Sequence, residues 1–513
     1  MAEALNHIKS FFLNIFWEDF CRHCQQNVRI GLVCGVFIGI WWLMRKPRGI
    51  PPGPRFTLPV VGDLLFLENA SQPVMLRTMR EKYGDIFSIY MGSSLFIVLN
   101  GYDVIKEALV KHGHIFSDKP HMFLYDLISD KKGIVFTSGQ LWKEQRKFAL
   151  ETLREFGFGK TILEDKIHEE IGYYIEVVDE HNGRPFDMCR LTQASASNII
   201  SSLVYGHRFD YDNLVFKEYL NNVDEMFGDL GSTAVLNFLP VLRFMPGDLF
   251  KYKRILKNMR GTENTIIKPS IQEHLNNYDE NNTNDYISSY IKEMKRLQKE
   301  GQTAYINEEN LVKSIGDLFV AGTETTSTAI LWTILYLLHH PNIQAKCYKE
   351  IQDVVGSGRL PSMRDKPSMP YNEAVLLEVL RKANVVTIGT PHGLNQDTVF
   401  RGYKIPKNAI ILPNLDSVLA DNKIWGDADV FRPERFLDKD GMVTKPDEFI
   451  PFSLGRRICL GESLAKMELF LFMSTLIQRF EFKPVDPDNL PKLEGVLGIT
   501  NSPYKYEVRA IPR

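Results

Sequence analysis

The chain has 513 residues, of which 44% are hydrophobic and 24% are charged, so it is an ordinary globular protein with material for a large core. Its formal net charge of −2 excludes a globally basic surface, and nucleic acid is therefore not an expected partner. The 6 cysteines are widely scattered and do not form a disulfide framework, which favours a reducing compartment for the main body.

An uncharged apolar run extends from Ile30 to Met44. Val28 extends it and Arg29 can snorkel, so residues 28–45 are predicted to form a transmembrane anchor, although a membrane span usually needs about 20 apolar residues. The alternative is a cleaved signal peptide, whose apolar core has a similar length. The sequence lacks the positively charged start and the small-residue cleavage site that a signal peptide needs.

The residues before the anchor, 1–27, form a predicted leader whose apolar stretch from Phe11 to Trp17 suits the membrane interface. The leader also contains Cys21 and Cys24 in a Cys-x-x-Cys pair, but no second pair accompanies them. We interpret this pair as incidental, or as a local disulfide on the far side of a membrane.

Basic residues between positions 45 and 48 follow the apolar run, so the positive-inside rule places the C-terminal bulk of the chain in the cytosol. Residues 46–60 are predicted to be a basic and proline-rich hinge, because Pro51-Pro52-Gly53-Pro54 cannot continue a helix. The remaining residues, 61–513, are predicted to form one large domain.

The start of this domain combines helix and strand signals. Residues 72–83 predict a helix, and the runs Ile86–Met91 and Leu95–Leu99, separated by Gly92, predict a hairpin in a small sheet at the edge of a mostly helical domain. Further along the chain, residues 160–275 supply several helical patterns separated by Gly and Pro.

One helix before this region carries two residue pairs at a spacing of four. Trp142 and Arg146 share one face of it, and Lys143 and Lys147 share a neighbouring face. The two lysines form either a solvated charged face or a docking patch for an acidic protein, and both interpretations stand equally.

The longest helical pattern runs from about Glu308 to His340 and closes at Pro341. It is apolar on most faces, so it is expected to cross the core, while Asp317 and Glu324 exclude a membrane span. Its middle reads Ala-Gly-Thr-Glu-Thr-Thr, and a glycine followed by hydroxyl residues weakens a helix locally. A threonine that bonds back to its own helix is the structural alternative to a functional role here.

Glu378 and Arg381 stand at i and i+3 on another predicted helix, a pair that usually forms only a surface salt bridge. Arg435, in the sequence Phe-Arg-Pro-Glu-Arg-Phe, follows further along the chain. Between them, the segments around His392 and from Phe400 to Pro406 predict strands and turns.

The last motif lies between Phe452 and Gly461, which reads Phe-Ser-Leu-Gly-Arg-Arg-Ile-Cys-Leu-Gly and leads into a helical pattern. A lone cysteine is usually a small buried hydrophobe. Cys459, however, stands at a helix start beside arginines, where its thiolate form is favoured. Gly455 and Gly461 would allow a large flat ligand to approach the sulfur, and Arg457 could pair with an acidic group on that ligand.

The pattern Phe-x-x-Gly-x-Arg-x-Cys-x-Gly resembles the haem-binding loop of the cytochrome P-450 superfamily. With the Trp-x-x-x-Arg, Ala-Gly-x-Glu-Thr-Thr and Glu-x-x-Arg motifs in order, the resemblance covers the chain from Pro51 to the C-terminus and is closest to animal microsomal family 2 monooxygenases. It implies a mainly α fold with small β-sheets, a single large haem-thiolate domain and an N-terminal membrane anchor.

The resemblance assigns roles at the haem. Cys459 would be the proximal thiolate ligand of haem b. Lys119 stands where the family has an arginine, which keeps the charge but loses the bidentate fork. With Lys119, the implied cofactor-binding residues on the propionate side are Trp142, Arg146, His392 and Arg457.

On the opposite face of the haem, the resemblance implies that Thr325 donates a hydrogen bond to dioxygen and that Glu324 belongs to the proton supply. Glu378, Arg381 and Arg435 would form a buried structural triad under the haem. The expected substrate pocket is apolar and comprises Phe123, Leu124, Phe238, Phe319, Ala321, Val385, Val386 and Ile499, with the region from Met226 to Phe244 as its roof.

The implied activity is insertion of one oxygen atom from dioxygen into an apolar small molecule: a fatty acid, a steroid or a xenobiotic. Electrons would come from NADPH through cytochrome P-450 reductase, with cytochrome b5 as a further candidate partner, at the endoplasmic reticulum membrane with the catalytic domain in the cytosol. The alternatives are a reductase-independent peroxide isomerase, which intact Glu324 and Thr325 disfavour, and a non-catalytic haem or ligand carrier.

Overall fold

The computed structural model describes residue 39 and residues 46–54, 57–58, 61–63, 71–156, 161–302 and 305–513. The predicted leader and membrane anchor, with Cys21 and Cys24, lie outside the described residues except for Gly39.

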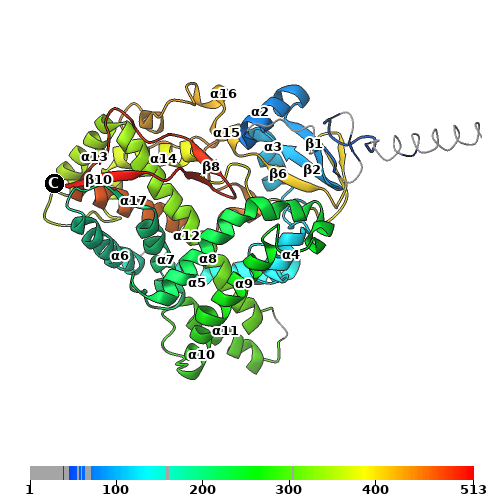
Figure 1. Ribbon diagram of the computed structural model, residues 1–513, viewed down its shortest axis with the longest axis horizontal. Helices are drawn as coiled ribbons and strands as arrows, with labels where there is room; N and C mark the ends of the chain where they lie inside the picture. Colours follow the sequence, from blue (N-terminus) through cyan, green and yellow to red (C-terminus); the bar gives the residue numbers. More distant parts are fainter. Residues whose placement is uncertain are drawn as a thin grey trace, which may run out of the picture.

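Helices form most of the described structure, and the strands are short and gathered in small sheets (Figure 1). This confirms the predicted mainly α class. The α-helices are α2 (Gln72–Tyr83), α3 (Tyr102–Lys106), α4 (Phe123–Ser129), α5 (Gly139–Glu155), α6 (Thr161–Glu180), α7 (Cys189–Val204), α8 (Leu214–Thr233), α9 (Tyr252–Thr262), α10 (Lys268–Asn276), α11 (Tyr286–Lys299), α12 (Glu308–His339), α13 (Pro341–Val354), α14 (Pro370–Ala383), α15 (Asp416–Leu419), α16 (Asn422–Trp425) and α17 (Glu462–Arg479). The strands are β1 (Ile86–Met91), β2 (Ser94–Leu99), β3 (Phe186–Asp187), β4 (Thr398–Phe400), β5 (Tyr403–Ile405), β6 (Ile410–Pro413), β7 (Phe480–Pro484), β8 (Gly495–Leu497), β9 (Asn501–Pro503) and β10 (Glu507–Pro512).

The predicted hairpin forms β1 and β2, which pair antiparallel, and β6 adds a parallel third strand on β2. This sheet lies at one end of the molecule (Figure 1). The proline-rich hinge is not a free tether where it reaches the sheet, because the amide and the hydroxyl of Ser88 donate to the carbonyls of Pro52 and Pro51, both at 2.7 Å. The hinge is therefore docked on β1.

Helix α12 crosses the centre of the molecule and ends at His339, one residue before the predicted end. Its N-cap is Asn307, whose side chain accepts a hydrogen bond from the backbone amide of Asn310. Of the helices that the structure describes, it alone is long and apolar enough to cross a membrane, and 72% of its most apolar window is buried. It is therefore a core helix and not a membrane span, as predicted from its apolar faces and from the acidic residues within it.

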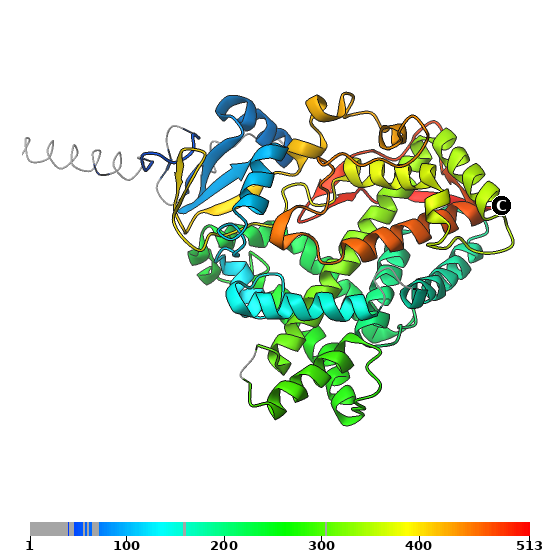
Figure 2. The ribbon, with the colours of Figure 1, turned by 180° about the vertical axis from the view of Figure 1, so that it is seen from behind.

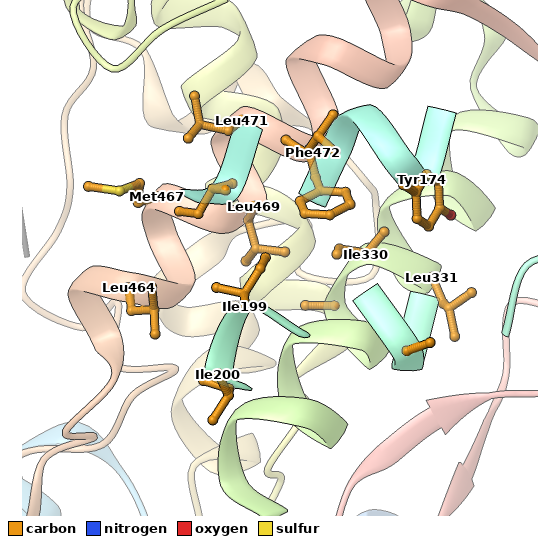
Figure 3. Packing of buried hydrophobic residues seen from close by; sticks show 14 of the residues in the cluster. Tyr174, Ile199, Ile200, Ile330, Leu331, Leu464, Met467, Leu469, Leu471 and Phe472 are labelled. Carbon is orange, nitrogen blue, oxygen red and sulfur yellow. The ribbon is translucent and has the colours of Figure 1, made fainter. Parts of the chain in front are cut away.

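The main core lies where α6, α7, α12 and α17 meet (Figure 3). Tyr174 of α6 packs edge-on against Phe472 of α17, with ring centroids 5.6 Å apart. Helix α7 contributes small buried residues such as Ala194, Ser197 and Ser201, which let its backbone approach α12 closely. This packing fixes the position of the middle turns of α12.

Glu378, Arg381 and Arg435 meet in a cluster whose side chains are 0–4% exposed. The Glu378 carboxylate lies 2.8 Å from the Arg381 guanidinium and 3.1 Å from that of Arg435. Arg381 also donates to the backbone carbonyls of Leu419 and Ala428, at 2.7 and 2.9 Å. A glutamate–arginine pair at this spacing usually lies on a surface. Here the pair is buried and links α14 to the chain around residues 419–435.

We expect Arg381→Met to lower the free energy of unfolding by about 3–5 kcal/mol, because it leaves the buried Glu378 carboxylate short of a partner and frees two carbonyls. Urea unfolding measures the change. Lys346→Met is the control, since Lys346 pairs with Glu434 on the surface, where both side chains are about half exposed, and such pairs contribute about 0–1 kcal/mol. Equal losses in the two variants would contradict a structural role for the buried cluster.

Candidate active site

An interior cavity of about 340 Å³ lies between α12 and the cysteine loop. Helices α5, α7, α14 and α17 and the segment after α14 complete its wall, and most of the lining side chains are apolar. Figure 2 shows α5 (cyan) and α17 (orange) on the same side of the molecule.

One stripe of α12 lines the cavity. Its members recur at the spacing of a single helix face, so consecutive turns present their side chains to the same space. They are Asp317, Leu318, Ala321, Gly322, Thr325, Thr326 and Ala329.

The cysteine loop is held by hydrogen bonds within its own backbone and by contacts with α5 and with Leu109. The Cys459 amide donates to the Phe452 carbonyl at 3.1 Å, and Arg146 donates to the Ile458 carbonyl at 2.6 Å. Gly455 has a φ of 78°, and a Cβ there would lie 2.1 Å from the Leu109 carbonyl oxygen, so only glycine fits. The Cys459 side chain opens onto the cavity.

Gly461 makes no close contact with other described parts of the protein, and the approach expected there is that of a ligand. Its φ of −90° is ordinary, and a Cβ there would meet no described atom within 4 Å. Gly461 instead lines the cavity, and its backbone amide faces the Cys459 sulfur.

Burial raises the pKa of the Cys459 thiol, and the Glu462 carboxylate raises it further. The Gly461 amide, Arg146 and Lys466 act in the opposite direction. Burial therefore opposes the thiolate form that the helix start and the nearby cations favour, and bonding of the sulfur to a metal would offset that cost.

Three cations gather at one edge of the cavity: Lys119, Arg146 and Arg457. None of them forms an ion pair with a carboxylate among the described residues. Lys119 donates to Thr390 at 2.8 Å and to the Pro391 carbonyl at 2.9 Å. Arg457 donates to the backbone carbonyls of residues 117 and 137 and lies over the Trp142 ring, 3.7 Å from its centroid.

Burial lowers the pKa of each of these cations. The pKa of Arg457 falls to about 9, with the charge of Arg146 as the second cause. The pKa of Lys119 falls well below its usual range, and both arginines add to the effect of burial. Positive charge at this edge is thus destabilised, and a bound anion would relieve that destabilisation.

Trp142 shares the cavity wall, and its buried indole Nε1–H has no hydrogen-bond partner among the described residues. His392 does not line the cavity. Its Nδ1 lies 2.7 Å from the Phe116 carbonyl oxygen, so Nδ1 carries the proton. Burial lowers the pKa of His392 to about 3, with the charges of Lys119 and Arg457 contributing.

Together these groups fit a flat anionic cofactor with a metal at its centre. The cysteine supplies a soft sulfur ligand, and the cations and the unpartnered Trp142 N–H supply donors for acidic groups at the cofactor edge. Haem has this form, since its iron accepts a thiolate and its propionates are carboxylates.

Thr325 lies on the cavity stripe, four residues after Ala321. Its hydroxyl donates to the Ala321 carbonyl at 2.7 Å, which is the hydrogen bond within the helix expected as the structural alternative. This hydrogen bond does not exclude the expected role, because a hydroxyl that releases the Ala321 carbonyl can donate toward the cavity.

Glu324 is buried but does not line the cavity. It lies about 100° around α12 from Thr325, so its side chain points to the rear of the helix. There its Oε1 accepts hydrogen bonds from Thr500 at 3.2 Å and from Ser502 at 3.3 Å. Burial raises the pKa of Glu324, while the hydroxyl groups of these partners lower it.

Of the eight expected pocket residues, Ala321, Val385 and Val386 line the cavity. No described residue between 205 and 316 lines it, so the expected roof over residues 226–244 is not part of this wall either.

The other five expected pocket residues do not line this cavity because packing takes them elsewhere. Phe123 stacks edge-on with Tyr252, and Leu124 joins a small separate cluster. Phe238 packs on Phe96, Phe319 on Tyr205 and Tyr219, and Ile499 is 52% exposed.

Several cavity residues had no local signal in the sequence that marked them as part of a site. Ile200, Leu203 and Val204 lie on α7, whose pattern resembles that of any buried helix. Asp317 also lines the cavity, and its carboxylate accepts from the amides of Ile134 and Val135 at 2.6 and 3.0 Å. The signal that marked Asp317 in the sequence was an acidic residue within an apolar helix.

Comparison with known proteins identifies the relatives of the chain. The family model named cytochrome P450 matches residues 51–509. Cytochrome P450 2U1 from Bos taurus is 40% identical over 504 residues, covering 93% of this chain and 92% of the relative. Cytochromes P450 2C3 and 2J1 from Oryctolagus cuniculus are each 38% identical; the alignments cover 94% and 95% of this chain, and 98% and 96% of those proteins.

The carboxyl of Asp317 predicts a pH-dependent stability. Burial raises its pKa to about 6 from an ordinary 3.8. The folded protein therefore binds this proton more tightly than the unfolded chain does, and the resulting stabilisation is present below about pH 4 and is lost as the pH rises through 6.

We expect wild type to lose about 1–2 kcal/mol relative to Asp317→Asn between pH 5 and pH 7, measured by urea unfolding of both proteins at each pH. Asp447→Asn is the control, because the side chain of Asp447 is 79% exposed. A wild-type to Asp317→Asn difference that stays constant with pH would contradict the assignment.

Proposed function

The chain belongs to the cytochrome P450 family and is a haem monooxygenase, and we propose that it inserts one oxygen atom into an apolar small molecule with electrons that NADPH supplies through cytochrome P-450 reductase. The observation that supports this proposal is the position of Cys459 at one side of an apolar cavity whose edge carries Lys119, Arg146 and Arg457. The proposed haem domain spans residues 61–513.

When bound, the haem supplies the activation of dioxygen and the oxygen transfer, chemistry that side chains cannot provide. In our proposal Cys459 ligates the iron, and Lys119, Arg146, Arg457 and the indole N–H of Trp142 hold the propionates. His392 packs behind this edge. We also propose that His392 contacts the propionate side of the cofactor, because Lys119 and Arg457, whose charges contribute to its lowered pKa, lie beside it.

The cavity side of α12 would face the reacting centre. The reaction consumes protons as well as electrons, because the second oxygen atom leaves as water. We propose that the Thr325 hydroxyl gives up its bond to the Ala321 carbonyl and donates into the cavity, and that Glu324 supplies protons from the rear of the same helix. The buried triad of Glu378, Arg381 and Arg435 would keep the cysteine side of the domain folded.

The substrate is proposed to be a fatty acid, a steroid or a xenobiotic, because Val385, Val386 and Ala321 and the cavity side of α7 offer apolar contact. The family 2 relatives are consistent with association with the endoplasmic reticulum membrane. We further propose an anchor at residues 28–45, after a leader at 1–27 and before the hinge at 46–60, with the catalytic domain in the cytosol.

The proposed electron donor would dock near the cysteine loop, on the side where α5 and α17 lie (Figure 2). Lys143 and Lys147 are exposed on α5, and Lys147 lies 3.9 Å from Glu151 across one turn. This charged face suits an acidic flavoprotein, with cytochrome b5 as a second candidate donor.

Reconstitution with NADPH–cytochrome P-450 reductase and lipid tests the proposal. A panel of a fatty acid, a steroid and an apolar drug is expected to yield a product bearing one atom from labelled dioxygen, at a rate that requires NADPH. Turnover of a fatty-acid hydroperoxide without NADPH, and no oxygen incorporation from dioxygen, would contradict the proposal in favour of a peroxide isomerase.

In the same assay, Thr325→Val is expected to lower product formed per NADPH consumed by about tenfold to a hundredfold, with the missing electrons released as hydrogen peroxide. Thr333→Val is the matched control, because Thr333 makes the same hydrogen bond within α12, to the Ala329 carbonyl at 2.8 Å, away from the cavity. Equal effects in both variants would assign Thr325 to helix stability alone.

A further inference from the structure

The Glu324 carboxyl occupies a polar pocket behind the cavity wall. It is 9% exposed and forms no ion pair with any described residue. Its Oε1 accepts from the hydroxyls of Thr500 and Ser502 at 3.2 and 3.3 Å, and these two hydroxyls lie 3.2 Å from each other. Thr328, one helical turn after Glu324, lies 3.2 Å from the Ser502 hydroxyl. A buried carboxyl is thus surrounded by hydroxyl groups and not by a cation.

The strand geometry of β9 accounts for this arrangement. Side chains alternate along a strand, so Thr500, just before β9, and Ser502 lie on one side while Asn501 lies on the other. Asn501 fixes the strand: its amide donates to the Val385 carbonyl at 2.8 Å, and its carbonyl accepts from the Trp332 indole at 2.7 Å. The two hydroxyls are therefore presented to α12 by a strand that is also tied to the cavity wall at Val385.

The opposite side of this pocket leads toward the surface. The side chain of Gln193 on α7 lowers the pKa of Glu324, and its amide donates to Asp224 of α8 at 2.8 Å. The Asp224 side chain is 45% exposed and pairs with Arg190 at 3.1 Å. These groups, with the half-buried Cys189 on α7, are the titratable and charged neighbours of Glu324. Polar groups thus extend from the exposed Asp224 side chain toward the rear of α12.

We propose that Thr500 and Ser502 are positioning residues for Glu324, which hold its carboxyl behind Thr325 in a state that can both release and regain a proton. The inference rests on the proposed function, in which Glu324 supplies protons. When Glu324 releases its proton, the two hydroxyls donate to the carboxylate that remains, and the proton is regained from solvent through the side where Asp224 is exposed.

Opposing physical effects make this role plausible for a buried acid. Burial and the negative charge of Asp224 raise the pKa of Glu324, so without partners the carboxyl would hold its proton. The hydrogen bonds from Thr500 and Ser502 stabilise the ionised form and lower the pKa. Removing both hydroxyls should therefore raise the pKa of Glu324, so that the carboxyl ionises less readily.

The test uses the full-length, haem-loaded enzyme and a Thr500→Val/Ser502→Ala double variant. Infrared difference spectra against Glu324→Gln follow the protonated Glu324 carboxyl as the pH is raised. We expect its proton affinity to rise about tenfold in the double variant, so the carboxyl band persists to higher pH than in wild type. Thr500→Ser, which keeps the hydroxyl, is expected to retain the wild-type titration.

Turnover provides the second readout. In the double variant, product formed per NADPH consumed is expected to fall several-fold, and the high-pH limb of the product-formation profile to shift upward with the carboxyl titration. A purely structural role for β9 would lower the unfolding midpoint and leave both the titration and the pH profile unchanged.

The outcomes separate this inference from the proposed function. If wild type forms product from dioxygen and NADPH while the double variant titrates as wild type does, the inference about Thr500 and Ser502 is wrong and the proposed function stands. If wild type forms no product under any tested condition but the carboxyl titration shifts as expected, the positioning of Glu324 stands and the proposed function fails. If the double variant does not fold, Thr500→Val alone, set against Thr500→Ser, decides by the same titration.

Discussion

The main physical constraint on this structure is buried positive charge that has no carboxylate partner among the described residues. Lys119, Arg146 and Arg457 converge on one edge of an apolar cavity, and burial lowers the pKa of each. Buried cations are costly unless an anion compensates them. In the proposed function, a cofactor that carries two carboxylates at its edge and a metal ligated by Cys459 would supply that compensation, so the protein and its haem are expected to be stable together.

Around this site, α12 presents apolar side chains on one face and a polar side chain on another face. The cavity stripe of α12 presents mainly small and apolar side chains with the Thr325 hydroxyl among them, while its rear face carries Glu324 into a hydroxyl-lined pocket. Close packing of α7 and α17 on α12 keeps these faces fixed, because buried helices cannot rotate without losing contacts throughout the core. In the proposed function, the same helix would therefore serve both substrate binding and proton supply.

Features set by local pattern were predictable from the sequence, and features set by packing were not. The long helix, the β1–β2 hairpin and the cysteine loop follow from periodicity, turn residues and motif spacing. Phe238 and Phe319 were expected in the pocket because they are apolar and aromatic, yet they pack on Phe96 and Tyr205 instead. The partnership of Glu324 with Thr500 joins residues 176 positions apart, and no local signal in either segment indicates it.

The central claim is that the Cys459 thiolate ligates haem iron, and the carbon monoxide difference spectrum of the dithionite-reduced protein tests it most directly. Cys459→Ser is compared with Cys189→Ser, which removes a half-buried thiol on α7 that does not line the cavity. The account predicts a strongly red-shifted Soret band in wild type and in Cys189→Ser, and its loss in Cys459→Ser. A folded wild-type protein with bound haem and no such band would contradict thiolate ligation and, with it, the monooxygenase mechanism.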